Sequence, residues 1–149
     1  MAFKLVMLPP QNDIYRGWAR RLAGELPQVE VVVAEDTQAA AAALVDADGA
    51  FGPLPADLLA VTTRLRWLQA NQAAPPAGFY YDALARHPLV ATNFREIFND
   101  HIGAHIMAFV LSFARGFHYY IPQQTRREWA KPPEDEGVVA LPGATALIV

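Results

Sequence analysis

The sequence predicts an α/β fold in which a parallel sheet is covered by helices, and three observations support this. Short apolar segments alternate with helical segments between residues 3 and 92. Each predicted helix lies between two predicted strands, which is the spacing that right-handed crossovers between parallel strands require. The strands are apolar along most of their length, as expected for strands that are buried on both faces.

Five segments have the composition of buried strands, and the segments between them have that of helices. Pro9 and Pro10 end the first strand. Asn12 or Asp13 can cap the helix that follows it, and Asp36 can cap the alanine-rich helix after the second strand. The predicted strands span residues 3–8, 29–33, 50–51, 67–70 and 89–92. The predicted helices span residues 13–26, 37–47, 55–64 and 79–86.

This alternation is typical of a flavodoxin-like domain, a parallel sheet flanked by helices on both faces. Ligands of such domains bind in the crevice beyond the carboxyl ends of the strands. We therefore expect a ligand site where four connections follow predicted strands. These connections span residues 9–12, 52–55, 71–78 and 93–96.

Composition excludes several classes of function. The formal net charge is -3, the pI is about 5.7, and no run of lysine or arginine is present, which argues against nucleic-acid binding. The absence of cysteine excludes disulfides and thiolate metal sites. Because residues 106–114 form the longest uncharged apolar stretch, far short of the roughly 20 residues that span a bilayer, we expect a cytoplasmic protein without membrane contact.

The connection over residues 71–78 is the most suggestive of the four. Its small side chains expose backbone N–H groups, which can hold a carboxylate. Pro75 and Pro76 stiffen the backbone there. The alternative is a plain connection between a strand and a helix, and position in the sequence does not decide between the two.

His101 and His105 lie four residues apart on one predicted helix face, in the outer frame of the zinc-protease motif. Ile102 stands where that motif has its glutamate, and no third ligand is evident, so no metal site is predicted. The alternative places His101 near the mouth of a cleft and His105 in an interface. Ser112, the only serine, is expected to bond a backbone carbonyl in mid-helix.

A long helix, capped by Asn99 or Asp100, is predicted over the segment from His101 to Phe117. Its apolar residues surround the helix instead of forming one stripe, so every face must be covered. One sheet domain covers one side only, and we expect this helix to leave the first domain and to pack on a second domain or subunit. The apolar residues are Ile102, Ile106, Met107, Phe109, Val110, Leu111, Phe113 and Phe117.

Four segments appear in an order that resembles a known family. They are LRWLQANQ (residues 65–72), PLVATNFREI (88–97), DHIGAHIMAFVLSFAR (100–115) and RREW (126–129), followed by an apolar segment. In order and spacing, the chain resembles the D-isomer-specific 2-hydroxyacid dehydrogenases over nearly its whole length.

The resemblance implies a two-domain enzyme. A flavodoxin-like substrate domain would span residues 1–98, an interdomain and dimerisation helix residues 99–131, and a linker with the first strand of a Rossmann domain residues 132–149. Ala144 to Val149 resemble that strand, cut just before the Gly-rich loop that binds NAD or NADP in the family. The apolar helix would pack on the cofactor domain and build a homodimer interface.

The resemblance also assigns candidate site residues. Gln72, Ala73, Ala74 and Pro75 fall where the family holds the substrate carboxylate in an S-A-G-V-D loop, with Ala74 in place of the glycine. Thr92 and Asn93 match a T-N pair, and Asn93 is expected at the cleft. Asn99, Asp100 and His101 fall where the family chain passes the cleft and hinge. The catalytic Arg, Glu and His of the family lie later in its chain, so none is assigned here.

Two functions remain open at this point. The chain is expected to be the substrate-binding portion of an NAD(P)-dependent oxidoreductase that acts on the CH–OH group of D-2-hydroxy acids and reduces 2-keto acids. It would be inactive alone, without bound cofactor. The alternative is a stand-alone, flavodoxin-like, dimerising binding module without catalysis. Neither involves metal, nucleic acid or membrane.

Overall fold

The computed structural model describes residues 2–131 and 138–147 of the chain. It divides into two compact units, Met1–Glu96 and Ile97–Val149. The two units are described separately below. The boundary between substrate domain and interdomain helix that the sequence predicts, at residue 98, stays a prediction.

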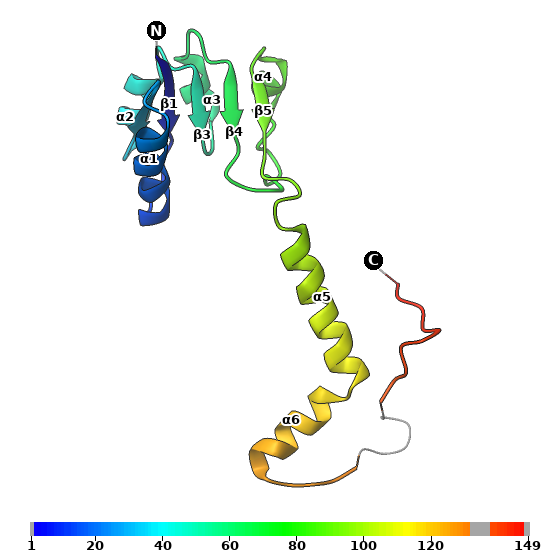
Figure 1. Ribbon diagram of the computed structural model, residues 1–149. Helices are drawn as coiled ribbons and strands as arrows, with labels where there is room; N and C mark the ends of the chain where they lie inside the picture. Colours follow the sequence, from blue (N-terminus) through cyan, green and yellow to red (C-terminus); the bar gives the residue numbers. More distant parts are fainter. Residues whose placement is uncertain (1, 132–137, 148–149) are drawn as a thin grey trace. The chain divides into compact units, whose positions relative to one another are not determined.

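The first unit is built on one parallel sheet of five strands in the order β2-β1-β3-β4-β5 (Figure 1). All four neighbouring pairs are parallel. This is the strand order of flavodoxin-like domains, and the order reverses direction between β1 and β3. The predicted fold class is confirmed. The strands are β1 (Phe3–Met7), β2 (Val29–Val33), β3 (Gly49–Phe51), β4 (Trp67–Gln69) and β5 (Val90–Thr92).

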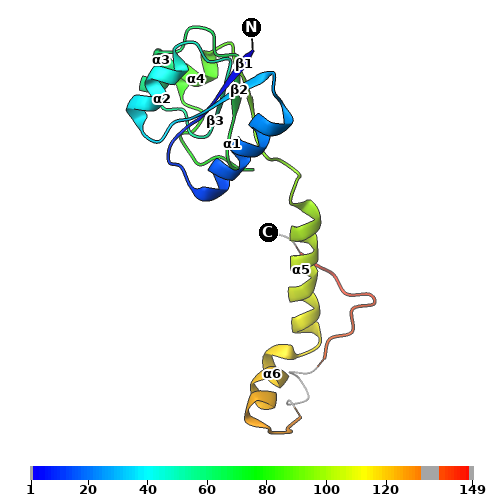
Figure 2. The ribbon, with the colours of Figure 1, turned by 60° about the vertical axis from the view of Figure 1, so that its left-hand side comes forward.

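Helices cover the two faces of this sheet unequally (Figure 2). α1 (Asp13–Glu25) lies on one face, where Ala19 packs with Leu5, Met7 and Phe51. The other three helices lie on the opposite face and contribute to a larger apolar core around Leu68. They are α2 (Thr37–Leu44), α3 (Ala56–Ala60) and α4 (Asp82–Arg86).

The side chain of Asn12 caps α1 as predicted, since its Oδ1 accepts a hydrogen bond from the Tyr15 amide at 2.8 Å. The apolar face of this helix does not include Ile14, the first apolar residue in its sequence. Ile14 is 62% exposed. Tyr15, Ala19 and Leu22 face the sheet instead, because positions separated by three or four residues share one side of a helix.

Asp46 and Lys4 form an ion pair near the amino ends of β1 and β3. The hydrogen bond from the Lys4 ammonium holds the pKa of the Asp46 carboxyl below its ordinary value of 3.8. A carboxyl with a lowered pKa in the folded state stabilises the fold above its unfolded-state pKa. That contribution is lost as the pH falls through the folded-state pKa.

We expect Asp46→Asn to remove this contribution. Above pH 3.8 the variant should therefore be less stable than the parent chain. The stabilities of the two proteins should converge as the pH falls below this value. Urea unfolding at a series of pH values measures the difference. Glu30→Gln is the control, because the exposed Glu30 side chain makes no ion pair with any residue that the structure describes. A constant difference across the acid range would contradict the expectation.

The second unit contains two helices, α5 (Asn99–Ala114) and α6 (Phe117–Arg126). The helix predicted from His101 to Phe117 is confirmed as far as Ala114, whereas the single helix predicted over residues 99–131 is wrong. Gly116 adopts the left-handed conformation at φ 67°, the Arg115 amide donates to the Leu111 carbonyl, and the Gly116 amide donates to the Phe113 carbonyl, which closes α5. Capping by Asn99 or Asp100 is also wrong, because Phe98 occupies the capping position without a side-chain hydrogen bond.

The apolar side chains of α5 are exposed on several sides of the helix. Ile102 is 55% exposed, Phe109 55% and Phe113 61% within the described parts of the chain. Nothing in those parts covers them. The Ser112 hydroxyl donates to the Ala108 carbonyl at 2.6 Å, as predicted for a serine in mid-helix. No helix in the described ranges combines the length and the apolar character that crossing a bilayer requires.

The predicted strand at Ala144 to Val149 is not formed in the part that the structure describes. Residues 144–147 are irregular, and residues 148–149 lie outside the described residues, as do residues 132–137 of the predicted linker. A strand exists only when a neighbour accepts and donates its backbone hydrogen bonds. The Ala144 amide bonds instead to the Leu141 carbonyl within its own turn, at 2.9 Å.

Candidate functional site

The carboxyl ends of the five strands form the candidate site of the first unit. The four connections that the sequence predicts at this edge follow β1, β3, β4 and β5 in the structure. The strand order reverses between β1 and β3, and in open α/β sheets the loops on either side of such a reversal diverge and leave a crevice. The candidate site is built from the loops around this crevice.

The loop after β4 presents its backbone to solvent. Gln72, Ala73 and Ala74 are exposed, and Pro75 is half-buried. The N–H groups of residues 72–74 make no hydrogen bond with any described residue. Three consecutive free donors next to small side chains are available to an anion, which is the arrangement that the sequence predicts for carboxylate binding.

Asn93 holds this loop from the neighbouring strand. Its Nδ2 donates to the Ala73 carbonyl at 3.0 Å, and its Oδ1 accepts from the Arg95 amide at 3.2 Å. The structure thus brings together two of the predicted site residues, Ala73 and Asn93, which lie twenty positions apart in the sequence. Because Asn93 donates to the Ala73 carbonyl, this hydrogen bond restricts the orientation of the peptide group that follows Ala73.

A cluster of aromatic rings supports the loops from the α1 side of the sheet. Tyr15, Trp18, Phe51 and Phe94 contact one another with ring centroids 5.3 to 6.4 Å apart, mostly edge to face. The Tyr15 hydroxyl accepts a hydrogen bond from Asn71 Nδ2 at 3.1 Å. The cluster therefore connects α1 to the beginning of the loop after β4.

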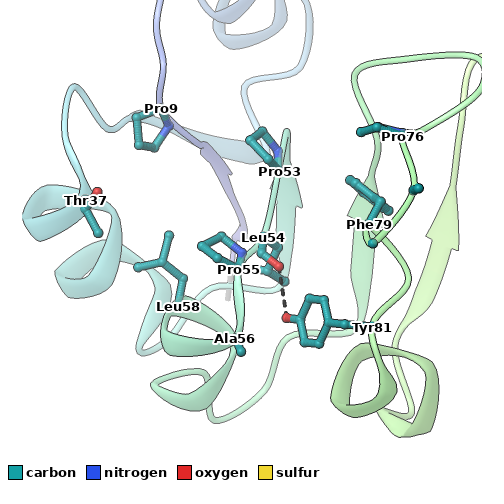
Figure 3. A pocket seen from close by; sticks show the side chains of 12 residues that line it. Pro9, Thr37, Pro53, Leu54, Pro55, Ala56, Leu58, Pro76, Phe79 and Tyr81 are labelled. Atoms are coloured by element: carbon teal, nitrogen blue, oxygen red, sulfur yellow. Dashed lines mark hydrogen bonds between the residues drawn. The ribbon is translucent and has the colours of Figure 1, made fainter.

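Beside the crevice, on the face that carries α2 and α3, lies a pocket of about 500 Å³ (Figure 3). Its lining is mainly apolar and comes from the loops after β1, β3 and β4 and from α2 and α3. The Tyr81 hydroxyl donates to the Leu54 carbonyl at 2.9 Å across the pocket wall. Burial raises the pKa of the Tyr81 phenol, and the nearby Asp57 carboxylate raises it further, so the hydroxyl remains a donor. Four prolines line the pocket, namely Pro9, Pro53, Pro55 and Pro76.

Gln11 joins the ends of β1 and β2 at the same edge. Its Nε2 donates to the carbonyls of Met7, Leu8 and Ala34 at 2.8 to 3.0 Å. Gln11 was not among the predicted site residues. A side chain amide directly after a strand and two prolines is the signal that could have identified it, because the carbonyls at strand ends need donors.

The remaining predicted residues lie in the other unit. Asn99, Asp100 and His101 form the first turn of α5 and are exposed. Their place at a cleft or hinge stays a prediction. The His105 ring contacts Phe109 with centroids 4.9 Å apart. Among the described residues, no three His, Asp or Glu side chains gather as a metal site would require.

Within the described part of the first unit, the carboxyl edge carries no histidine, since His87 precedes β5 at the opposite edge. The backbone donors of the loop after β4 can bind an anion. The edge supplies no histidine for acid or base catalysis. By itself, this edge can offer the backbone N–H groups of residues 72–74 as hydrogen-bond donors.

Comparisons with known proteins identify solved structures that resemble this chain. No protein-family model matches the chain, and no curated protein sequence matches it either. Among solved structures, a D-isomer specific 2-hydroxyacid dehydrogenase family protein from Aeromonas salmonicida subsp. salmonicida A449 is 27% identical. It matches 89% of this chain and 42% of its own length, with a TM-score of 0.66.

Two further solved structures share the fold. A D-isomer specific 2-hydroxyacid dehydrogenase family protein from Klebsiella pneumoniae 342 is 23% identical over 93% of this chain and 41% of its own, with a TM-score of 0.64. A protein from Pyrococcus horikoshii OT3 is 16% identical over 88% of this chain and 39% of its own, with a TM-score of 0.54. The chain thus spans about two fifths of the length of the structures it matches.

The strand order defines a flavodoxin-like α/β unit, a class of domain whose ligands bind at the carboxyl edge of the sheet. The resemblance that the sequence motifs indicate is confirmed by these matches. The chain is structurally similar to the D-isomer-specific 2-hydroxyacid dehydrogenase family of oxidoreductases.

Proposed function

We propose that this chain is the substrate-binding portion of an NAD(P)-dependent oxidoreductase that interconverts D-2-hydroxy acids and 2-keto acids. The observation that carries the proposal is the likeness to the Aeromonas salmonicida family protein over 89% of the chain. The free backbone donors after β4 support it, because every 2-keto acid and 2-hydroxy acid has a carboxylate to be held.

In this proposal the N–H groups of Gln72, Ala73 and Ala74 bind the substrate carboxylate. Hydrogen bonds to an ionised acceptor are about twice as strong as those between neutral groups. Asn93 positions the loop through the Ala73 carbonyl, and Pro75 limits its backbone motion. The substrate is thereby oriented with its second carbon beyond the edge of the sheet.

The cofactor is proposed for the whole protein. NAD or NADP supplies or accepts a hydride in this reaction class. The residues present here do not fit a dinucleotide, because the sequence contains no G-x-G-x-x-G segment. We therefore derive no step through the cofactor and expect the chain alone to bind neither NADH nor NADPH.

A titration followed by NMR tests carboxylate binding. Hydroxypyruvate added to the nitrogen-15-labelled chain is expected to shift the amide signals of residues 72–74 and the side-chain amide of Asn93. A dissociation constant of about 1 mM, or about -4 kcal/mol, is reasonable for a few exposed hydrogen bonds. Hydroxyacetone, which lacks the carboxylate, is the matched control. Shifts of equal size with both compounds, or none at this loop, would contradict the proposal.

Asn93→Ala is expected to weaken hydroxypyruvate binding by up to about tenfold, because one hydrogen bond that positions the loop contributes about 0.5–1.5 kcal/mol. The same titration measures the change. Gln72→Ala is the control, since it keeps the backbone N–H and removes a side chain that makes no hydrogen bond with the described residues. Equal losses in the two variants would show that Asn93 has no special role.

Activity is tested on the protein expressed from the complete reading frame that contains this chain. It is expected to oxidise NADH or NADPH when glyoxylate, hydroxypyruvate or pyruvate is added, whereas the 149-residue chain alone is expected to be inactive. Oxidation by the chain alone would contradict the assignment of this chain to substrate binding only.

The exposed apolar surface of α5 favours a second property, self-association, which the chain would have as part of an enzyme or as a stand-alone binding module. Large contiguous apolar surfaces on proteins in water are usually covered by a partner. We propose that a second copy of the chain covers this helix.

Light scattering at micromolar concentration is expected to give the mass of a dimer. Phe109→Glu should shift the equilibrium to monomer, because a charge in an apolar interface lacks a partner. Ile14→Glu is the control, since it places the same charge at an exposed apolar position of the first unit. A monomer of the parent chain under these conditions would contradict self-association.

A further inference from the structure

β2 is an edge strand whose outer backbone groups are free. It pairs only with β1 among the described strands. The Phe3 amide donates to the Gln28 carbonyl and the Ala34 amide to the Met7 carbonyl. Alternate residues of a parallel strand bond to the same neighbour. Residues 28, 30, 32 and 34 therefore face β1, while Val31 and Val33 direct their N–H and C=O groups away from the sheet.

A groove of about 270 Å³ runs beside this free edge, between β2 and α1. Ala19 and Ala23, one helical turn apart, form the wall on the helix side, and Val31 and Val33 form the strand side. The small alanine side chains leave room for an additional apolar side chain. The groove and the free backbone groups thus lie next to each other.

The charges around the groove are unequal. Arg16 is engaged by Glu35 at 2.7 Å and by Asp13 at 3.3 Å. Arg20, on the rim of the groove, makes no ion pair or hydrogen bond with any described residue. On the other face of β2, the exposed carboxylate of Glu30 is also unpaired within the described residues. An added strand would therefore meet a free positive charge on the α1 side and a free negative charge on the α2 side.

We propose that the outer edge of β2 is a docking site for an extended acidic segment of a partner protein, which adds to the sheet as a sixth strand. Its backbone pairs with the free groups of Val31 and Val33. Since alternate side chains of a strand share one face, an apolar side chain enters the groove and an acidic side chain two positions away reaches Arg20.

Charge argues against a second copy of this chain at the same edge. Two β2 strands that pair in antiparallel fashion are related by a two-fold axis perpendicular to the sheet, so both copies of α1 lie on the same face. The symmetric arrangement brings Arg20 of each copy toward Arg20 of the other. Like charges at close range are unfavourable, whereas an acidic segment gains an ion pair there.

The probe is the synthetic peptide acetyl-Thr-Asp-Thr-Val-Thr-Asp-Thr-amide, added to the labelled full chain. Its valine and aspartates share one face of an extended strand. Binding is expected to slow amide hydrogen exchange at Val31 and Val33 by at least roughly tenfold. The amides of Glu30 and Val32, which already bond to β1, are expected to change little. A peptide of the same sequence with N-methylated valine and aspartates should not bind, because it cannot complete the ladder.

Arg20→Ala is expected to weaken peptide binding about two- to fivefold, the effect of one exposed ion pair. Arg21→Ala is the matched control. It removes the same charge from α1, at a position that pairs with Glu25. Equal effects of the two variants, tight binding of the N-methylated peptide, or no protection at Val31 and Val33 would overturn the proposal. The proposal would also be overturned if, without peptide, the protection of these amides rose with protein concentration. That result would show that a second copy of the chain binds at this edge.

Discussion

Leu68→Ala is expected to lower the free energy of unfolding of the first unit by about 2–5 kcal/mol, the usual cost of removing a large buried side chain and leaving a cavity. Leu68 is at the centre of β4 and is fully buried. It packs with Val6, Leu44 and Leu58 from other elements of the core.

Urea unfolding followed by tryptophan fluorescence measures this change. Trp18 and Trp67 contact the core of the first unit, whereas Trp129 is 88% exposed and its emission should change little on unfolding. Leu147→Ala is the control, because Leu147 is 87% exposed and its loss should cost less than about 0.5 kcal/mol. A loss below about 1 kcal/mol for Leu68→Ala would show that the core of the first unit is packed more loosely than described.

The fold of the first unit was predictable because its signals are local. Each strand is a short apolar segment bounded by residues that end it, such as Pro9 after β1. The parallel arrangement follows from the alternation with helices. The strand order is confirmed by the pairing of β1 with both β2 and β3. Propensity and pattern therefore agree with the tertiary structure in this unit.

The second unit shows where local signals were misjudged. Apolar composition continues from α5 into α6, and for this reason one helix was predicted over residues 99–131. Gly116 was the available signal, because glycine is the residue most often found in the left-handed conformation that ends a helix. The strand expected at Ala144 depended on a partner strand, and composition cannot supply one.

The candidate site was predictable in position and only partly in detail. The edge of the sheet follows from the topology, and the loop after β4 follows from its small residues. The contact of Asn93 with Ala73 joins loops after different strands, and that of Tyr15 with Asn71 joins residues 56 positions apart. Such contacts depend on the register of strands, which one sequence does not determine.

Gly52→Ala is expected to destabilise the first unit by about 1–3 kcal/mol, the cost of forcing a residue with a side chain into a conformation open mainly to glycine. Gly52 has φ 115°, and a Cβ there would lie 3.3 Å from the Cβ of Leu8. Both constraints act at the point where the loops after β1 and β3 diverge. The loop after β3 should therefore shift, and with it the wall of the pocket beside Leu54.

In the matched control, Gly24→Ala, the change in stability is expected to have the opposite sign. Gly24 lies in α1 with no atom within 4 Å of the position that a Cβ would take. Gly24→Ala should raise the stability by about 0.4–1 kcal/mol, because alanine restricts the unfolded chain and favours the helix. Urea unfolding measures both variants, and amide shifts near Leu54 report on the loop. If Gly52→Ala were neutral, the left-handed backbone at residue 52 would not be required for the fold, and the crevice between the loops would be free to change shape.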